Sequence, residues 1–175
     1  YEVEAQIRAF WGDLEANFKK EIDPTHKIMA WVVRHAAWVT TRFMVKADGR
    51  TGYMRMCGRE YGGDICEVGE MVYFHKGSLT GKSKLEPRWA LAGWVGKTEG
   101  SDEHMVATEK GVDTARAVRR RPHGERFSAK WLEDFEGVPW SMQASNQENK
   151  HVGMKYITDQ LILRYGMTPG CTRCL

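Results

Sequence analysis

The sequence has no long run of apolar residues. A helix that crosses a membrane needs roughly 20 consecutive apolar residues, and no stretch of this 175-residue chain approaches that length, which excludes a spanning segment. It also shows no secretory signal peptide and no initiating Met. The first residue is Tyr1, and helical periodicity begins directly after it. The last residues are Cys-Thr-Arg-Cys-Leu, directly after a Cys-x-x-Cys pair. From both ends we expect a piece of a longer protein.

Cysteine is scarce, and several catalytic signatures are missing. With four cysteines and no signal peptide, we expect a reduced intracellular setting, nucleus or cytoplasm, rather than a disulfide framework. The sequence shows no Ser–His–Asp arrangement, no nucleophile elbow and no glycine-rich phosphate loop. No internal repeat is visible.

The composition is that of a globular protein. Hydrophobic residues make up 42% and charged residues 28%, and seven tryptophans supply core anchors. The length suits one ordinary domain or two small ones. The net charge is only +3, so basic residues matter for binding only where they cluster.

The first 62 residues show helical periodicity. One apolar face recurs at spacings of three and four from Val3 to Phe18, and a second from Ile28 to Phe43. Pro24 stands where the second helix is about to start, and Asp48-Gly49 is a turn signal after it. This pattern predicts an antiparallel helical pair, followed by one short helical turn and a loop in 51–63.

From Gly69 the pattern changes to β-like runs. Four runs with turn residues between them cover 69–77, 88–100, 102–111 and 112–122. Their length and spacing predict a small antiparallel barrel, with a domain boundary between 62 and 69. The expected fold class is therefore α+β.

Beyond Pro122 the pattern becomes irregular. One or two helical turns are predicted in 128–135, a polar linker in 142–153 and a last helix in 154–166. We therefore divide the chain into helices (1–62), barrel (69–122) and a third part (123–175), which holds the linker, a short helix and the Cys-x-x-Cys.

Several stretches together resemble one family. They are EVEAQIRAF, WVVRHAAWVTTRFMVKADGRTGYMRMCGREY, GEMVYF, KLEPRWALAGWVGKTEGSDEHMVATEKGV and ARAVRRRP. Their order resembles the C-terminal part of the integrase in the Pol polyprotein of copia-like retrotransposons, over about residues 1 to 122. The resemblance implies the last helices of a ribonuclease-H-like catalytic core, then a Src-homology-3-like DNA-binding barrel. The tail resembles the linker towards reverse transcriptase.

The resemblance gives Glu4 a specific role. This residue matches the third carboxylate of the integrase catalytic triad, which holds Mg²⁺ or Mn²⁺ for strand transfer of element DNA. The two aspartates of the triad would lie upstream of Tyr1, so we expect this chain to be inactive by itself. From the residues alone, Glu2 and Glu4 also suit the first turn of a helix, where the helix dipole favours acids.

Basic residues cluster in the barrel and predict DNA contacts. Residues 116–130 contain six basic residues against one acid, a local net charge of +5. Cations spaced along a surface bind phosphates by releasing counterions. The alternative is a solvated strand edge. The candidate contacts are Arg116, Arg119, Arg120, Arg121, Lys82, Lys84, Arg88 and, for stacking, Trp94. Trp89 is a second stacking candidate, and we expect at least one of these two tryptophans to lie in the core.

The arginine run itself limits how many of its members can bind. If 112–122 is one regular strand, alternation sends Arg116 and Arg120 to one side and Arg119 and Arg121 to the other. Pro122 cannot donate to a ladder and ends the strand. We therefore expect two or three phosphate contacts rather than four.

Two other features have an ordinary structural explanation as an alternative to a functional one. Cys171 and Cys174 form half of a possible Zn²⁺ site, with His151 as the nearby imidazole and further ligands expected beyond Leu175; an idle pair of thiols is the alternative. His35 lies on the apolar face of the second helix and reads as a buried histidine with one hydrogen-bond partner.

Three functions remain open from the sequence. The first is an integrase fragment that contributes one catalytic carboxylate and part of the DNA-binding surface. The second is a non-enzymatic DNA- or chromatin-binding module derived from a retroelement. The third is an interaction protein that dimerises through its tryptophan-rich helical pair, and a homo-oligomer is compatible with all three.

Overall fold

The computed structural model describes residues 2–76 and 87–142. Several predicted features lie outside these residues: Lys82, Lys84, His151, the last helix and both cysteines of the Cys-x-x-Cys pair. The described part contains helices and one antiparallel sheet, so the α+β class is confirmed. No helix in these two ranges is long and apolar enough to cross a membrane.

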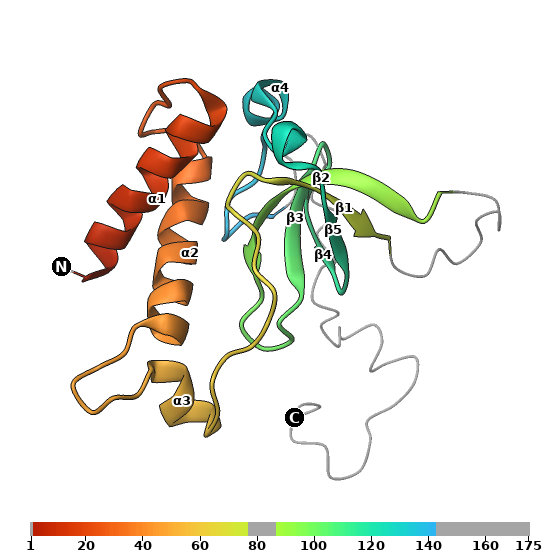
Figure 1. Cartoon of the computed structure of the whole chain (residues 1–175). Helices are drawn as coiled ribbons and strands as arrows, with labels where there is room; N and C mark the ends of the chain where they lie inside the picture. Colours follow the sequence, from red (N-terminus) through yellow and green to blue (C-terminus); the bar gives the residue numbers. More distant parts are fainter. Residues whose placement is uncertain (1, 77–86, 143–175) are drawn as a thin grey trace, which may run out of the picture.

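The predicted helical pair is present. Helices α1 (Glu2–Phe18) and α2 (Ile28–Phe43) run antiparallel and pack against each other (Figure 1). The short helix α3 (Gly52–Cys57) follows, as the sequence predicts. The Thr51 side chain caps its start by accepting a hydrogen bond of 3.1 Å from the Met54 N–H, and Gly58 ends it at φ 71°.

The sheet has five strands where the sequence predicted four β-like runs. These strands are β1 (Met71–His75), β2 (Trp89–Lys97), β3 (His104–Thr108), β4 (Gly111–Ala115) and β5 (Val118–Arg120). Their order in the sheet is β4-β3-β2-β1-β5, antiparallel throughout. The last predicted run is two strands, because the chain turns at 116–117 and β5 pairs with β1 instead of extending β4. Arg116 therefore lies in a turn, and the alternation expected for a continuous strand does not include it.

The sheet curls strongly. Strands β4 and β5 are its two edges, yet only two residues separate Ala115 from Val118. In a flat sheet the two edge strands would lie four strand spacings apart, which is about 19 Å. The three peptide steps from Ala115 to Val118 reach at most about 11 Å. The edges must therefore approach each other, although no ladder joins them in the described residues.

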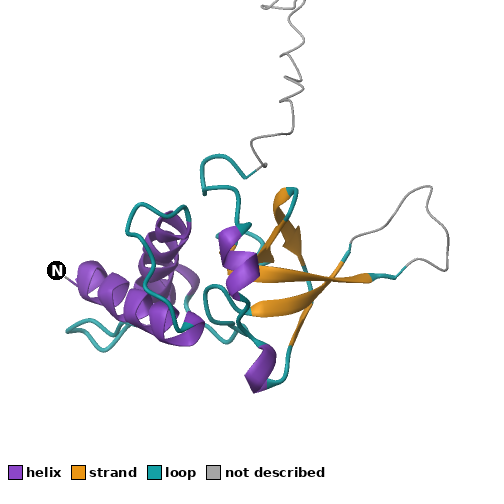
Figure 2. Cartoon of the chain, turned by 90° about the horizontal axis from the view of Figure 1, so that it is seen from above, coloured by secondary structure: helices purple, strands orange, loops and turns teal. Residues whose placement is uncertain are grey.

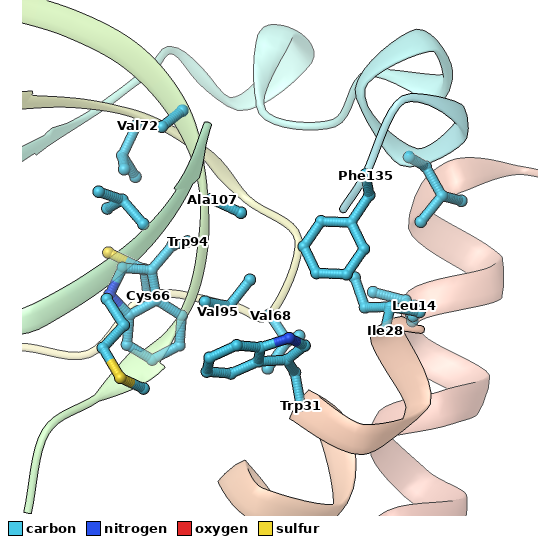
Figure 3. Close-up of a cluster of buried hydrophobic side chains, with 14 of the residues drawn as sticks. Leu14, Ile28, Trp31, Cys66, Val68, Val72, Trp94, Val95, Ala107 and Phe135 are labelled. Carbon is cyan, nitrogen blue, oxygen red and sulfur yellow. The ribbon is translucent and has the colours of Figure 1, made fainter. Parts of the chain in front are cut away.

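Helices and sheet share one hydrophobic core. Figure 3 shows Trp31 of α2 beside Val95 of β2, and Leu14 and Ile28 of the helical pair beside Phe135, all in one cluster of buried residues. Helix α4 (Ala129–Glu133) lies between the helical pair and the sheet in the view from above (Figure 2), and Leu132 and Phe135 join the same core.

Residues 123–142 belong to this packing as well. The indole N–H of Trp31, which is fully buried, donates a 3.1 Å hydrogen bond to the Gly137 carbonyl. The indole N–H of Trp131 donates at 3.2 Å to the Ala107 carbonyl, which holds α4 against β3. The described residues of the third part of the chain, 123–142, are thus packed onto the fold.

Candidate nucleic-acid interface

One face of the sheet is open to solvent over β1, β2 and β5. The strand register places Tyr73, Leu91 and Arg119 in one row across these strands, with His75 and Trp89 in the adjacent row. Directly paired residues point to the same side of a sheet. Tyr73 and Leu91 are 42% and 43% exposed, whereas Val72 and Phe74, which alternate with Tyr73, are buried. We call the five residues of the two rows the open face.

Arg119 is held in place on the open face by an aromatic ring. Its guanidinium carbon lies 4.4 Å from the centroid of the Trp89 ring, and the His75 ring meets Trp89 edge-on at 5.3 Å. No carboxylate in the described residues pairs with Arg119. Its charge is therefore not neutralised there, while the stacked ring restricts its orientation.

Arg120, next to Arg119, points to the other side of β5, and its side chain, 40% exposed, pairs with a buried acid. Its guanidinium makes two bonds to the Glu70 carboxylate, from Nε to Oε1 at 2.7 Å and from Nη2 to Oε2 at 2.6 Å. Glu70 is completely buried and also faces Arg126, whose Nε lies 3.4 Å from Oε1. The hydrogen bonds that Arg120 donates to Glu70 raise the pKa of Arg120. As a DNA contact Arg120 would have to leave this pair.

The other two arginines of the run are also paired, with different strength. Arg121 binds the carboxylate and the carbonyl of Glu125, at 2.5 and 3.0 Å. Arg116 touches Glu103 at 3.3 Å, but its side chain is 92% exposed, and such surface pairs contribute little. Arg119 and Arg116 are therefore the two members of the run whose charges are least engaged by acids.

The predicted stacking residue Trp94 is in the core. It is fully buried, and its indole N–H donates a 3.0 Å hydrogen bond to His104 Nδ1. A ring with no exposed face cannot stack on a base, so the core role expected for one of the two tryptophans falls to Trp94. Trp89 is the one on the open face. Arg88, which precedes it, is exposed, and its carbonyl accepts a 2.8 Å hydrogen bond from the Lys76 N–H.

Glu4 lies on an exposed part of α1. Its carboxylate pairs at 3.4 Å with Arg8, one helical turn further on, and Glu2 pairs with Lys46 at 2.5 Å. Across the two described ranges, no three His, Cys, Asp or Glu residues converge as a metal site would require.

Cys66 is buried, which raises the pKa of its thiol to about 12.

The buried histidine expected at position 35 is confirmed, with one difference. His35 is 4% exposed and stacks between Phe10 and Trp38, at ring distances of 5.1 and 5.9 Å. Burial, with a smaller effect from Arg34, lowers its pKa to about 4. The hydrogen-bond partner that we expected is missing at Nδ1. Trp31 and Trp38 are equally buried, so they offer no exposed surface for the dimer considered from the sequence.

Two polar clusters were not found from the sequence. The first is Glu70 with Arg120, 50 residues apart, and the second is Tyr61 with Asp102 and Lys97. No local spacing connects such distant residues. The only signal in the sequence is that Glu70 and Lys97 stand inside β-like apolar runs, where an acid or a lysine needs a buried partner.

Comparison of the chain with protein-family models, with curated proteins and with solved structures gave no match.

Proposed function

We propose that the chain is the C-terminal part of a retroelement integrase and that its curled sheet binds DNA. The observation that carries the DNA-binding half is the Arg119–Trp89 stack, an unneutralised cation on an open aromatic sheet face. The strand order and the curl support a Src-homology-3-like barrel. The integrase half rests on the resemblance of residues 1–122, together with the confirmed helical pair that precedes the sheet.

In this proposal the DNA contact is to the backbone. Arg119 offers its N–H edges to a phosphate at little entropic cost, because stacking on Trp89 already restricts the side chain. Arg116 in the β4–β5 turn and Arg88 at the start of β2 extend the cationic surface. Tyr73 presents a ring beside Arg119 for contact with a sugar or a base. No set of side chains suggests reading of a base sequence.

Salt-dependent binding of a short DNA duplex tests this proposal. The logarithm of affinity should fall linearly with the logarithm of salt concentration, and Arg119→Gln should reduce that slope by about one. Lys110→Gln is the matched control, since Lys110 is exposed in the β3–β4 turn and the charge change is the same. Absence of binding at low salt, or equal slopes for the two variants, would refute the DNA-binding proposal.

The catalytic half places Glu4 as a metal ligand in the intact protein. An exposed carboxylate on α1 is free to join two aspartates supplied from upstream, and together they would hold Mg²⁺ or Mn²⁺ for phosphoryl transfer. Cys171 and Cys174 would contribute to a Zn²⁺ site in the same protein.

Strand transfer by a longer protein that includes the upstream sequence tests the catalytic half. Glu4→Gln should abolish transfer, while Glu2→Gln, one half-turn away on the same helix, should retain it. If the longer protein binds DNA but transfers no strands with either divalent ion, the non-enzymatic DNA- or chromatin-binding module is the better description.

A further inference from the structure

A cavity lies where the C-terminal end of α2 meets the β2–β3 turn. Small-ligand sites measure about 300–1,000 Å³, and this cavity measures about 550 Å³. It lies away from the open face. Its walls come from α2, α3, the loop after α3 and the β2–β3 turn, and the residues that matter here are Arg42, Tyr53, Arg59, Tyr61, Glu99 and Asp102.

Arg42 is surrounded by aromatic rings. Its guanidinium carbon lies 4.0 Å from the centroid of Trp38 and 5.5 Å from those of Tyr53 and Tyr61. Its Nε is buried without a hydrogen-bond partner, and no ion pair joins Arg42 to a carboxylate in the described ranges. By contrast, Arg55 on the neighbouring helix α3 forms two bonds to Asp48, at 3.0 and 2.7 Å.

One of the three acids that line the cavity, Asp102, is engaged by another cation. Asp102 accepts hydrogen bonds from the buried Lys97 at 2.8 Å and from the Tyr61 hydroxyl at 2.8 Å. Glu99 acts electrostatically on Arg34. The charged residues that line the cavity are two cations, Arg42 and Arg59, and three acids, Glu60, Glu99 and Asp102. The excess charge becomes one positive only when two cations from behind this lining are included, Lys97, which pairs with Asp102, and Arg34, on which Glu99 acts.

We propose that this cavity binds a phosphate group, held by the guanidinium groups of Arg42 and Arg59 beside the rings of Tyr53 and Tyr61. A planar guanidinium fixed by stacking presents its remaining N–H groups as a ready fork for phosphate oxygens. The rings and the volume leave room for a nucleoside attached to that phosphate. The phosphate belongs either to a nucleic-acid backbone or to a free nucleotide, and the site does not depend on the open face.

Titration with inorganic phosphate and with adenosine monophosphate tests the site, followed by the ¹⁵N signal of the Arg42 Nε–H. Both ligands should shift this signal saturably in the wild-type chain. Because a hydrogen bond to a charged group contributes about 1.5–3 kcal/mol, Arg59→Gln should weaken binding by roughly tenfold or more. Arg55→Gln should bind like the wild type, because in the wild-type chain Arg55 is already paired to Asp48.

Arg59→Gln is the more informative variant, because Arg59 is exposed and its loss does not disturb the core. Arg42→Lys keeps the charge but loses the fork, and it should bind more weakly while it remains folded. A wild-type chain without saturable shifts, or equal affinities of the wild-type and Arg59→Gln chains, would overturn the proposal.

A competition experiment identifies the source of the phosphate. If a DNA duplex displaces adenosine monophosphate, and Arg59→Gln weakens duplex binding, the site is part of a nucleic-acid path. If the nucleotide binds and the duplex does not compete, the ligand is a free nucleotide. The Arg119→Gln variant separates this outcome from failure of the open face, because it should leave nucleotide binding in the cavity unchanged.

Discussion

The Glu70 carboxylate and the Arg120 guanidinium form a two-bond ion pair whose acid is completely buried, with bonds of 2.7 and 2.6 Å. Glu70 directly precedes β1, and Arg120 ends β5. The Glu70 carboxylate also accepts a 3.1 Å hydrogen bond from the Glu67 N–H. The pair therefore fixes the edge strand β5 to the turn that leads into the sheet.

Loss of Arg120 should destabilise the fold. Arg120→Met removes the principal partner of a buried charge and leaves Glu70 with Arg126, at 3.4 Å, and the Glu67 N–H. Breaking a buried pair from one side costs about 3 kcal/mol, which urea unfolding would measure. Arg116→Met is the control, because that side chain is 92% exposed and its removal should leave stability nearly unchanged. Equal losses in the free energy of unfolding would mean that the Glu70–Arg120 pair stabilises the fold no more than an exposed surface pair does.

Gly93 is the point at which α4 rests on the sheet. A Cβ atom built at this position would lie 2.1 Å from Cζ2 of Trp131, far inside any real contact distance. Gly93→Ala should therefore push Trp131 off the sheet and cost about 1–3 kcal/mol by overpacking. Gly100→Ala is the control, since nothing lies within 4 Å of its Cβ position. Thermal unfolding of both variants checks this, and matching melting temperatures would contradict it.

The Trp89–Arg119 stack predicts that these two residues act as a unit in DNA binding. Trp89→Leu should weaken binding mainly because it releases Arg119, so the double variant should lose little more than Arg119→Gln alone. Cation–π pairs contribute about 0.5–1 kcal/mol at exposed sites, and the coupling energy should be of that order. The measurement is a double-mutant cycle of duplex affinity at one fixed salt concentration. Strictly additive losses would show that Trp89 contacts DNA independently.

The sequence was most informative where periodicity determines structure. The spacing from Val3 to Phe18 and from Ile28 to Phe43 predicted α1 and α2, because packing of one apolar face is what stabilises such helices. The alternation after Gly69 predicted β strands, yet the break at Arg116-Ala117 was missed. No Gly or Pro marks that turn, and its position is set by pairing of β5 with β1, a contact between residues far apart in the chain.

The candidate sites were only partly accessible to sequence reasoning. Local charge density pointed to the arginine run, and alternation limited how many of its members could bind, but neither identified which ones. Their partners separate them: Glu70 and Glu125 engage two, while Arg119 rests on Trp89, 30 residues earlier in the chain. Likewise, the rings around Arg42 come from α2, α3 and the following loop, and no spacing in the sequence predicts that they meet.

His35 should make stability fall in mildly acidic solution. Burial lowers its pKa to about 4 in the folded chain, against about 6.5 when unfolded. Between these two values the unfolded state binds the extra proton, so stability is fully present above about pH 6.5 and is lost as the pH falls towards 4. The difference amounts to about 3 kcal/mol. His26 and His104, whose pKa values are also lowered by burial, add to the same slope.

His35→Phe isolates this contribution. The phenyl ring keeps the packing against Phe10 and Trp38, and no hydrogen bond is lost at Nδ1, which has no partner. At pH 7 the variant should therefore be about as stable as the wild type, and urea unfolding between pH 7 and 4.5 should show a shallower decline. His123→Gln, at an exposed position, should leave the decline unchanged. If His35→Phe loses stability over this pH range as steeply as the wild type, the acid sensitivity originates at another group.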